Sequence, residues 1–247
     1  MPEGDTIHRA ARTLHTALAG RVVTRFESVL PQLLRVNDET PVAGRTIERV
    51  RSEGKNLLID FSGDLHLHTH MRMHGAWHLY RPGERWRKRR SDMRIVLETD
   101  AWLAVGFNIP VAGFNPAIEI GPDLLADTFD FEEAKRRIRE RGAEEIADVL
   151  LNQRVVAGIG NIYKSETLFG ARIHPLMLVR DLSDEQLDVV LRTARKLLRT
   201  AAMNRRDTWY VYSRGGQPCR KCGAPIAFAK QGRDVRPTYW CPKCQPV

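Results

Sequence analysis

The chain has 247 residues, of which 43% are hydrophobic, and its formal net charge is +9. This apolar content suffices to bury a core and excludes the disordered class, and no run of 18 apolar residues predicts a membrane span. The basic balance favours an acidic partner, usually nucleic acid or an anionic membrane surface. Because the N-terminus has no apolar signal-peptide segment, we expect a cytoplasmic protein with reduced thiols.

A helix followed by strands is predicted for the first half of the chain. The helix is expected near residues 6–18. Apolar segments broken by glycine and polar residues predict strands within residues 19–30, 44–62, 65–79 and 93–119. Between residues 65 and 79, apolar residues occupy odd positions and histidines occupy even ones, as in a half-buried strand.

The second half is predicted to be helical, after a linker near residues 120–129. Ser183 and Gln186 form a capping box at the start of a long helix. Shorter helices are expected at residues 131–141, 144–151 and 161–169. The long helix has an apolar face at helical spacing, which indicates core packing, formed by Leu187, Val190, Leu191, Ala194, Leu197, Leu198 and Ala201.

Four cysteines near the C-terminus form two C-x2-C pairs separated by eighteen residues: Cys219, Cys222, Cys241 and Cys244. Each pair can supply two thiolates from one turn, and four thiolates complete the tetrahedral shell of a structural Zn²⁺ ion. Two disulfides or four unrelated thiols are the alternatives. We predict one structural zinc ion that holds a hairpin too small to fold alone. The same tail, residues 211–247, has seven Lys or Arg and one acid.

Four segments then point to one family. They are residues 1–6 (MPEGDT), 54–58 (GKNLL), 152–163 (NQRVVAGIGNIY) and 236–245 (RPTYWCPKCQ). In this order they resemble the formamidopyrimidine-DNA glycosylase and endonuclease VIII family, from residue 2 to residue 245. The resemblance implies an α+β multidomain fold that binds DNA in a cleft. Its parts would be a two-layer β-sandwich with an opening helix (residues 1–120), a helix–two-turn–helix domain (121–210) and a zinc finger (211–247).

The resemblance assigns the chemistry to the amino terminus. Removal of Met1 exposes the secondary amine of Pro2, and an α-amino group, with a pKa of about 8, is partly neutral and nucleophilic at neutral pH. Glu3 is implied as the general acid and base, and Lys55 as a group that reaches a phosphate and assists catalysis. The implied reaction releases a damaged base through a Schiff base on Pro2, followed by β,δ-elimination. A proline without a role, a solvated glutamate and a surface lysine are the alternatives.

The resemblance also places phosphate-binding residues on both halves of the chain. It assigns His70, Asn161 and Arg236 to the phosphates beside the lesion, together with Lys55. Arg154 is a further candidate from the turn before Asn161. Backbone amides at the start of a helix make a phosphate site, although an ordinary N-cap is the alternative for Asn161.

Met73 matches the family residue that wedges into the base stack after the damaged nucleotide has left. Strict alternation would place Met73 on the side opposite His70, as a core residue, so a wedge requires the strand to end or turn near Gly75. The usual Arg and Phe partners of the wedge are not found, and Phe107 or Phe114 could substitute.

Two other patterns leave alternatives open. Histidines 66, 68, 70, 74 and 78 could form a metal cluster, but we favour a polar, partly DNA-facing strand with only His70 assigned. Residues 85–90 (RWRKRR) are expected to form a hairpin loop that either touches DNA or is a solvated charged face.

The short joint at residues 204–218 favours the endonuclease VIII branch, and therefore oxidised pyrimidines and abasic sites. Asp5 and Thr6 depart from the usual Pro-Glu of that branch. We expect a cytoplasmic, nucleoid-associated monomer that acts on damaged double-stranded DNA, with single-stranded or bubble DNA left open. A DNA-binding protein without chemistry and an unrelated zinc-ribbon protein are the competing hypotheses.

Overall fold

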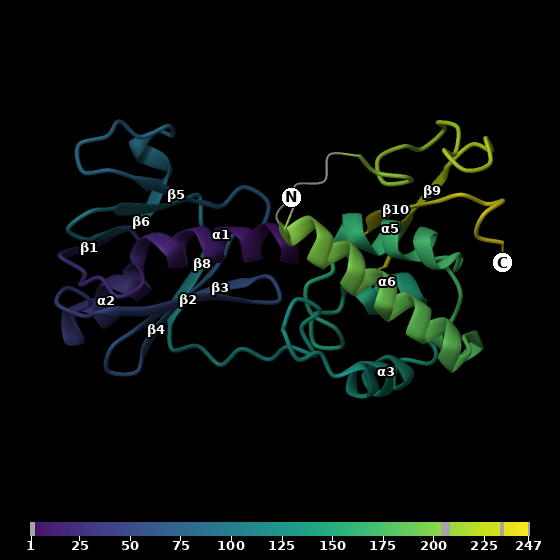
Figure 1. The fold of residues 1–247 in the computed structure, drawn as a ribbon, viewed down its shortest axis with the longest axis horizontal. Coiled ribbons are helices and arrows are strands. Elements are labelled where there is room, and N and C mark those ends of the chain that lie inside the picture. The colour runs from purple at the N-terminus through teal and green to yellow at the C-terminus, as the bar shows by residue number, and fades with distance from the viewer. Residues whose placement is uncertain (1–2, 204–207, 233–234, 247) are drawn as a thin grey trace. The chain divides into compact units, whose positions relative to one another are not determined.

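The apolar segments of the first half build a two-layer β-sandwich, as expected (Figure 1). The computed structural model describes residues 3–203, 208–232 and 235–246. The chain divides into unit 1, Met1–Ile118, and unit 2, Glu119–Val247. Unit 1 contains two antiparallel four-stranded sheets, with strand orders β1-β6-β7-β5 and β2-β3-β4-β8. The strands are β1 (Arg25–Ser28), β2 (Ile47–Glu53), β3 (Asn56–Phe61), β4 (Leu65–His70), β5 (Ala76–Tyr80), β6 (Met93–Glu98), β7 (Leu103–Phe107) and β8 (Val111–Phe114).

Two helices accompany the sandwich. Helix α1 (Gly4–Leu18) contacts β2 and β3 and buries Ile7, Ala11 and Leu14, which lie on one helical face. Helix α2 (Pro31–Glu39) was not predicted. Only Leu33 of α2 is buried, so the segment lacks the apolar stripe from which a short helix can be recognised in a sequence.

Strand β4 confirms the predicted alternation. Its residues at odd positions, from Leu65 to Thr69, are buried, and the histidines between them are half-buried. The buried side chains join the core between the two sheets, whereas the histidines lie on the opposite face of their sheet.

Unit 2 is mainly helical. Its helices are α3 (Phe131–Arg139), α4 (Ile146–Leu151), α5 (Asn161–Ala171) and α6 (Asp184–Met203), with a short 3₁₀ turn η2 (Val179–Asp181). The predicted capping box is confirmed, because Ser183 and Gln186 exchange two side-chain-to-backbone hydrogen bonds at 2.8 and 3.2 Å. The predicted apolar face of α6 enters the core of unit 2, with Leu197 only partly buried. Among the described residues, no helix is long and apolar enough to span a bilayer.

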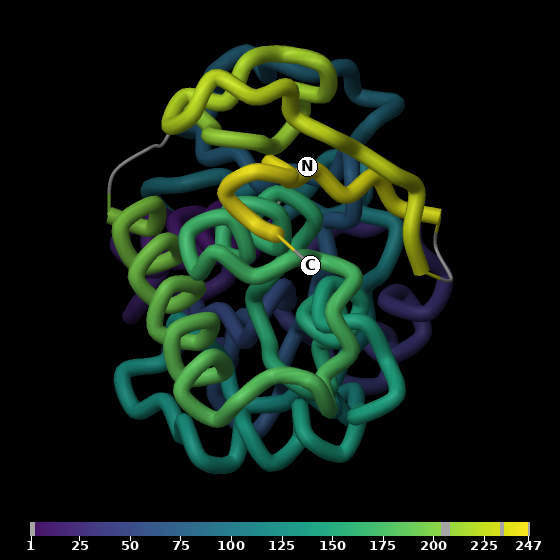
Figure 2. The backbone as a smooth tube through the Cα atoms, turned by 90° about the vertical axis from the view of Figure 1, so that its right-hand side faces the viewer, coloured from purple at the N-terminus to yellow at the C-terminus, as the bar shows by residue number. Residues whose placement is uncertain are grey.

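The C-terminal segment forms a hairpin of β9 (Ala227–Gln231) and β10 (Arg236–Trp240). Figure 2 shows this segment, in yellow, lying over the helices of unit 2, and β10 contacts α5. A small apolar cluster, which includes Phe169 of α5, Val211 and Ile226, packs beside the cysteines. The hairpin therefore rests on α5 and is not an isolated appendage.

Candidate functional site

Glu3 occupies the N-cap position of α1 and is buried, with 1% of its surface exposed. Its carbonyl oxygen accepts hydrogen bonds from the backbone N–H groups of Thr6 (3.0 Å) and Ile7 (3.1 Å). The position of Glu3 is thus determined by the first turn of the helix, and its carboxyl group is shielded from bulk water. Pro2, the predicted nucleophile, lies outside the described residues.

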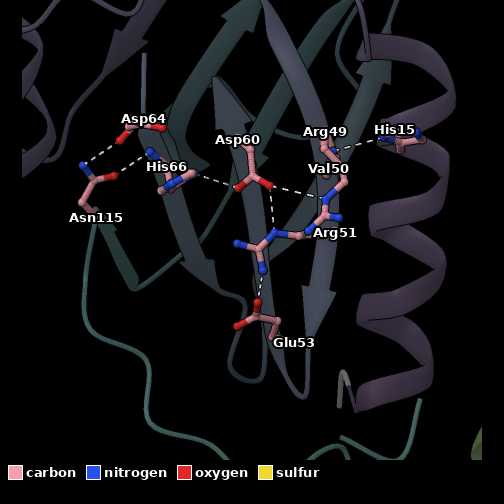
Figure 3. A network of polar contacts seen from close by, with 9 residues as sticks. All are labelled: His15, Arg49, Val50, Arg51, Glu53, Asp60, Asp64, His66 and Asn115. Carbon is pink, nitrogen blue, oxygen red and sulfur yellow. Dashed lines mark hydrogen bonds and ion pairs between the residues drawn. The ribbon is translucent and has the colours of Figure 1, made fainter. Parts of the chain in front are cut away.

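Helix α1 lies along β2 and begins near the turn that contains Lys55. The Nδ1 atom of His15 accepts the N–H of Val50 (3.2 Å). Nearer the start of the same helix, His8 Nδ1 lies 3.2 Å from Ser52 Oγ. Moving towards the start of α1 therefore means moving towards the end of β2, where the β2–β3 turn follows (Figure 3). Gly54, with φ of +57°, and Lys55 form this turn. Glu3 and Lys55 consequently lie at the same end of unit 1.

His70 lies at the same end of unit 1 as Glu3 and Lys55. Strand β3 pairs Leu57 with Thr69, which places the turn with Lys55 beside the end of β4. Burial, and then the positive charges of Arg72 and Lys55, lower the pKa of His70 to about 4. The ring is therefore neutral at pH 7. Because Nδ1 accepts the N–H of Arg72 (3.1 Å), the proton is carried by Nε2, which can donate to a phosphate oxygen.

Met73 lies in a turn between β4 and β5, where the alternation of the strand is broken. The N–H of Gly75 donates to the carbonyl oxygen of Met71 (2.8 Å), and a Cβ atom on Gly75 would lie 2.5 Å from that oxygen. Met71 is buried, whereas Met73 is 58% exposed. The turn that the wedge hypothesis requires is therefore present, and Met73 is not a core residue.

The two phenylalanines considered as partners of Met73 are packed in unit 1. Phe107 is fully buried in a cluster with Tyr80, so it is a core residue and does not fill a gap in DNA. Phe114 is half-buried and its ring lies 5.9 Å from that of Phe26. The structure therefore identifies no aromatic partner for Met73 among these two.

The histidines of β4 bind polar neighbours on the adjacent strand. His66 Nδ1 lies 3.0 Å from Asp60, which also accepts a hydrogen bond from Arg51 (2.8 Å), as Figure 3 shows. His68 Nε2 lies 2.8 Å from the side-chain oxygen of Asn56. Within the described ranges, the only group of three or more His, Cys, Asp or Glu residues placed to share a metal ion is that of the four cysteines. The structure thus gives no support to a histidine metal cluster.

In unit 2, the side chain of Gln153 holds the two turns between α4 and α5. Its Nε2 donates to the carbonyl oxygens of Leu151 (2.9 Å) and Ile159 (3.0 Å), and its Oε1 accepts the N–H of Gly158 (3.0 Å). Gly158 has φ of +105°, a conformation that favours glycine. These bonds determine where α5 begins. Gln153 was not predicted as a functional residue, because a side chain that bonds both ends of its own turn leaves no recognisable periodicity in the sequence.

Asn161 and Arg236 are brought together at the start of α5. Asn161 is 3% exposed, and its Nδ2 donates to the carbonyl oxygen of Pro237 (2.8 Å), the neighbour of Arg236. Arg236 is half-buried and lines a cavity of about 560 Å³, whose wall also includes Glu144, Glu145 and Asp148. The N-terminus of a helix carries partial positive charge, so it is the start of α5, and not this partly acidic cavity, that favours a phosphate.

The polar contacts of the hairpin fix the position of Arg236. The ammonium group of Lys164, which is fully buried, donates to Thr238 Oγ1 (2.7 Å). Gln231 faces Arg236 across the hairpin and donates to Glu145 next to α4. The hairpin is therefore attached to both helices of the helix–two-turn–helix segment. These contacts fix the backbone position from which the Arg236 side chain extends.

Arg154 is exposed on the first of the two turns. Its side chain pairs with Glu119 at 2.9 Å, and both side chains are 72% exposed. An ion pair this exposed contributes little to stability, so Arg154 can exchange Glu119 for a phosphate at small cost.

The four cysteines fit a zinc ion. Their sulfur atoms all lie within 4.8 Å of one another, with Cys219 Sγ 4.0 Å from Cys244 Sγ and Cys222 Sγ 3.4 Å from Cys241 Sγ. Four thiolates around a tetrahedral zinc ion at about 2.3 Å would be separated by about 3.8 Å. The predicted structural zinc ion is confirmed, with two ligands at the Cys219 turn and two after β10.

Three family profiles match successive parts of the chain. The formamidopyrimidine-DNA glycosylase N-terminal domain matches residues 1–108, and the formamidopyrimidine-DNA glycosylase H2TH domain matches residues 120–212. A zinc finger found in FPG and IleRS matches residues 216–247.

Similar proteins extend the comparison over the full length. The chain is 39% identical to the probable endonuclease 8 2 of Streptomyces coelicolor, over 99% of this chain and 94% of that protein. It is 35% identical to the DNA-(apurinic or apyrimidinic site) lyase Nei2 of Mycolicibacterium smegmatis, over 99% of each chain. The Lactococcus lactis formamidopyrimidine-DNA glycosylase bound to DNA with an abasic site superposes with a TM-score of 0.86 at 23% identity, over 100% of both chains, and shares the fold.

Proposed function

We propose, from the premise that this chain belongs to the formamidopyrimidine-DNA glycosylase family, that it is a bifunctional DNA glycosylase and abasic-site lyase of base excision repair. The observation that carries the proposal is the common location of the buried Glu3, Lys55 and the neutral His70 at one end of unit 1. A buried carboxyl group beside phosphate-binding groups is suited to acid–base chemistry on a nucleotide.

In the proposed reaction the amine of Pro2 attacks C1′ of the damaged nucleotide. The C1′–N bond to the base breaks, a C1′–N bond to Pro2 forms, and the proton that the Pro2 nitrogen loses is balanced by the one that the released base takes up. Glu3 donates a proton to the ring oxygen as the C1′–O4′ bond opens, which leaves an iminium ion on Pro2. Loss of a proton from C2′ then expels the 3′ phosphate, and loss of one from C4′ expels the 5′ phosphate. Glu3 is the group that accepts and returns protons in these steps.

Phosphate-binding residues hold the flipped-out nucleotide for this chemistry. On unit 1, Lys55 supplies a positive charge and His70 a neutral donor. On unit 2, Asn161 and Arg236 bind phosphate at the start of α5, and Arg154 adds a contact from the turn before it. Met73, which is exposed in its turn, enters the gap in the base stack.

The substrate class follows the relatives. Similar proteins are named endonuclease 8, and one is named an abasic-site lyase. Together with the short joint before the zinc-binding hairpin, this favours oxidised pyrimidines and abasic sites in duplex DNA. Because its substrate is the chromosome, the protein would act at the nucleoid in the cytoplasm.

Borohydride trapping tests the proposal. Protein with a free Pro2 is incubated with duplexes that carry an abasic site or dihydrouracil, and the reduced adduct is mapped by mass spectrometry. We expect the adduct on Pro2, and lost base release with retained DNA binding for both Pro2→Gly and Glu3→Gln. Glu39→Gln, which alters an exposed glutamate of α2, is the matched control and should behave as the unmodified protein.

Two results would contradict these assignments. An adduct on a lysine side chain would remove Pro2 from the mechanism, and undiminished base release by Glu3→Gln would remove Glu3. If no substrate gives an adduct with zinc-loaded protein, the chain is a DNA-binding protein without this chemistry.

A further inference from the structure

The segment between β5 and β6 carries six basic residues that the proposed chemistry does not use, five of them within residues 85–90. We call residues 81–92 the basic loop; it ends in a 3₁₀ turn, η1 (Arg90–Asp92), and connects two strands of the first sheet (Figure 1). One of its basic residues, Arg81, lies over the ring of Trp102 at 3.7 Å. The other five are Arg85, Arg87, Lys88, Arg89 and Arg90, of which the four arginines are exposed. A charged loop of this kind is usually mobile and solvated, unless contacts with the sheet hold it in place.

Trp86 anchors the basic loop to the sheet. Its ring lies 5.6 Å from that of Phe107 in an edge-on contact and 6.4 Å from that of Tyr80 in a stacked one. The hydroxyl oxygen of Tyr80 accepts the backbone N–H of Arg87 at 3.1 Å. These residues belong to an apolar cluster separate from the main core of unit 1. Two of the loop's arginines also lie over these rings, Arg87 at 6.0 Å from that of Tyr80 and Arg90 at 5.8 Å from that of Trp86. The loop thus has its own packing against the sheet.

The charges of the basic loop are not balanced within the protein. Among the described residues, Arg90 alone of the five has a carboxylate within 4.0 Å, that of Glu27 at 3.7 Å. Helix α3 provides the contrast, since Arg136 and Arg137 both pair with Glu133, at 2.7 and 2.6 Å. A preorganised group of unbalanced cations is the form of a site for a polyanion.

The basic loop also lies near the end of unit 1 that carries Met73. Phe107 is paired with Ala76, the first residue of β5, so the contact of Trp86 with Phe107 brings the loop back along the strand. Ala76 follows the turn that holds Met73. The basic loop, which follows β5, and the turn with Met73, which precedes β5, therefore lie near the same end of the sheet.

We propose that the basic loop is a second DNA-binding surface, which contacts backbone phosphates outside the damaged nucleotide and does not read the base sequence. The proposal rests on the proposed function, which supplies duplex DNA as the polyanion. Each phosphate contact releases condensed counterions, so the loop would add affinity for undamaged flanking DNA and increase the salt dependence of binding.

The test compares two triple variants with the same loss of charge. One is Arg87→Gln, Lys88→Gln, Arg89→Gln in the basic loop. The other, Arg12→Gln, Arg35→Gln, Lys196→Gln, changes exposed residues scattered over the surface. Binding to undamaged duplexes of one and of three helical turns is measured by fluorescence anisotropy at several salt concentrations.

We expect the loop variant alone to lose affinity for the longer duplex. The slope of log K against log salt should fall by up to about 2.7, at about 0.9 for each lost phosphate contact. The shorter duplex, when centred on a lesion, should be bound and cleaved equally by both variants. The proposal is overturned if both triples lose the same affinity, or if the loop variant loses binding to phosphatidylglycerol vesicles while it keeps its binding to DNA.

The outcome is independent of the test of the proposed function, because undamaged DNA requires no chemistry. If the unmodified protein forms the Pro2 adduct and the loop variant keeps full affinity and salt slope, only the second surface is refuted. If no adduct forms but the salt slope depends on the loop, the surface stands and the catalytic assignment fails.

Discussion

Replacing Glu166 with glutamine should loosen the joint between the helices of unit 2 and the zinc-binding hairpin. Glu166 lies on α5 and is 3% exposed. One carboxylate oxygen accepts the backbone N–H groups of Val211 (2.8 Å) and Tyr212 (3.0 Å), and the other accepts that of Tyr210 (3.0 Å). A single side chain therefore satisfies three consecutive backbone donors on the segment that leads to Cys219.

The magnitude follows from these three bonds. A glutamine oxygen can retain Val211 and Tyr212, but as neutral bonds, while its NH₂ group would face the N–H of Tyr210. A hydrogen bond to a charged group contributes about 1.5–3 kcal/mol, and a neutral one about 1 kcal/mol. One lost and two weakened bonds together should cost about 3 kcal/mol. Since Tyr210 is 36% exposed, hydration of its N–H can reduce this figure towards about 2 kcal/mol.

Amide hydrogen exchange measures the effect where it occurs. A loss of about 3 kcal/mol should accelerate exchange at residues 210–212 by about a hundredfold, because each 1.4 kcal/mol is a factor of ten. A chelator should also remove zinc faster. Glu140→Gln, an exposed carboxylate paired with Arg136, is the control and should change exchange at these residues by less than about threefold. Equal exchange rates in the two variants would refute the inferred role of Glu166.

Three further predictions concern the site itself. Met73→Ala should leave the free energy of unfolding within about 0.5 kcal/mol, because the side chain is exposed, yet slow base release about tenfold; a core-like loss of stability in urea unfolding would contradict this. The pKa of His70 is lowered to about 4, so between pH 6.5 and 4 the imidazole takes up a proton in the unfolded chain but not in the folded one. The free energy of unfolding should therefore fall as the pH falls over that range. His70→Asn should show a shallower loss, and identical pH profiles for the two proteins would exclude the effect. Chelation of zinc, or Cys241→Ser, should unfold the hairpin and weaken DNA binding, while circular dichroism retains the sheet signal of unit 1. Added Zn²⁺ should reverse the effect of the chelator but not that of Cys241→Ser, and unchanged binding would separate the hairpin from DNA recognition.

Features with a local pattern could be predicted from the sequence. The spacing of the cysteines predicted the zinc ligands, because two tight turns place their sulfur atoms without help from the rest of the chain. The capping box at Ser183 depends on residues three apart and was confirmed. The alternation up to His70 predicted β4. The same pattern showed that an exposed Met73 requires a turn near Gly75, and that turn is present.

Features that depend on distant partners could not be predicted. Glu166 looked like an ordinary helical residue, since the backbone groups that it binds lie more than forty positions away. Trp86 stood in a run of charges, and only the fold shows that Phe107 and Tyr80 receive it. Phe107 was considered as a partner of Met73 because nothing near it in the sequence shows that Trp86, twenty-one positions earlier, packs against it.

The place of Glu3 at the start of α1 links reactivity to folding. Its carboxyl group is buried only while the first turn of the helix is formed and Ile7 and Leu14 are packed against the sandwich. A nascent chain, or one whose first helix has detached, has the same residues but a solvated carboxylate and an undirected amine. Under the proposed mechanism, an incompletely folded molecule therefore lacks the buried acid–base group that base release requires, and intact bases are not exposed to that chemistry until the enzyme is folded.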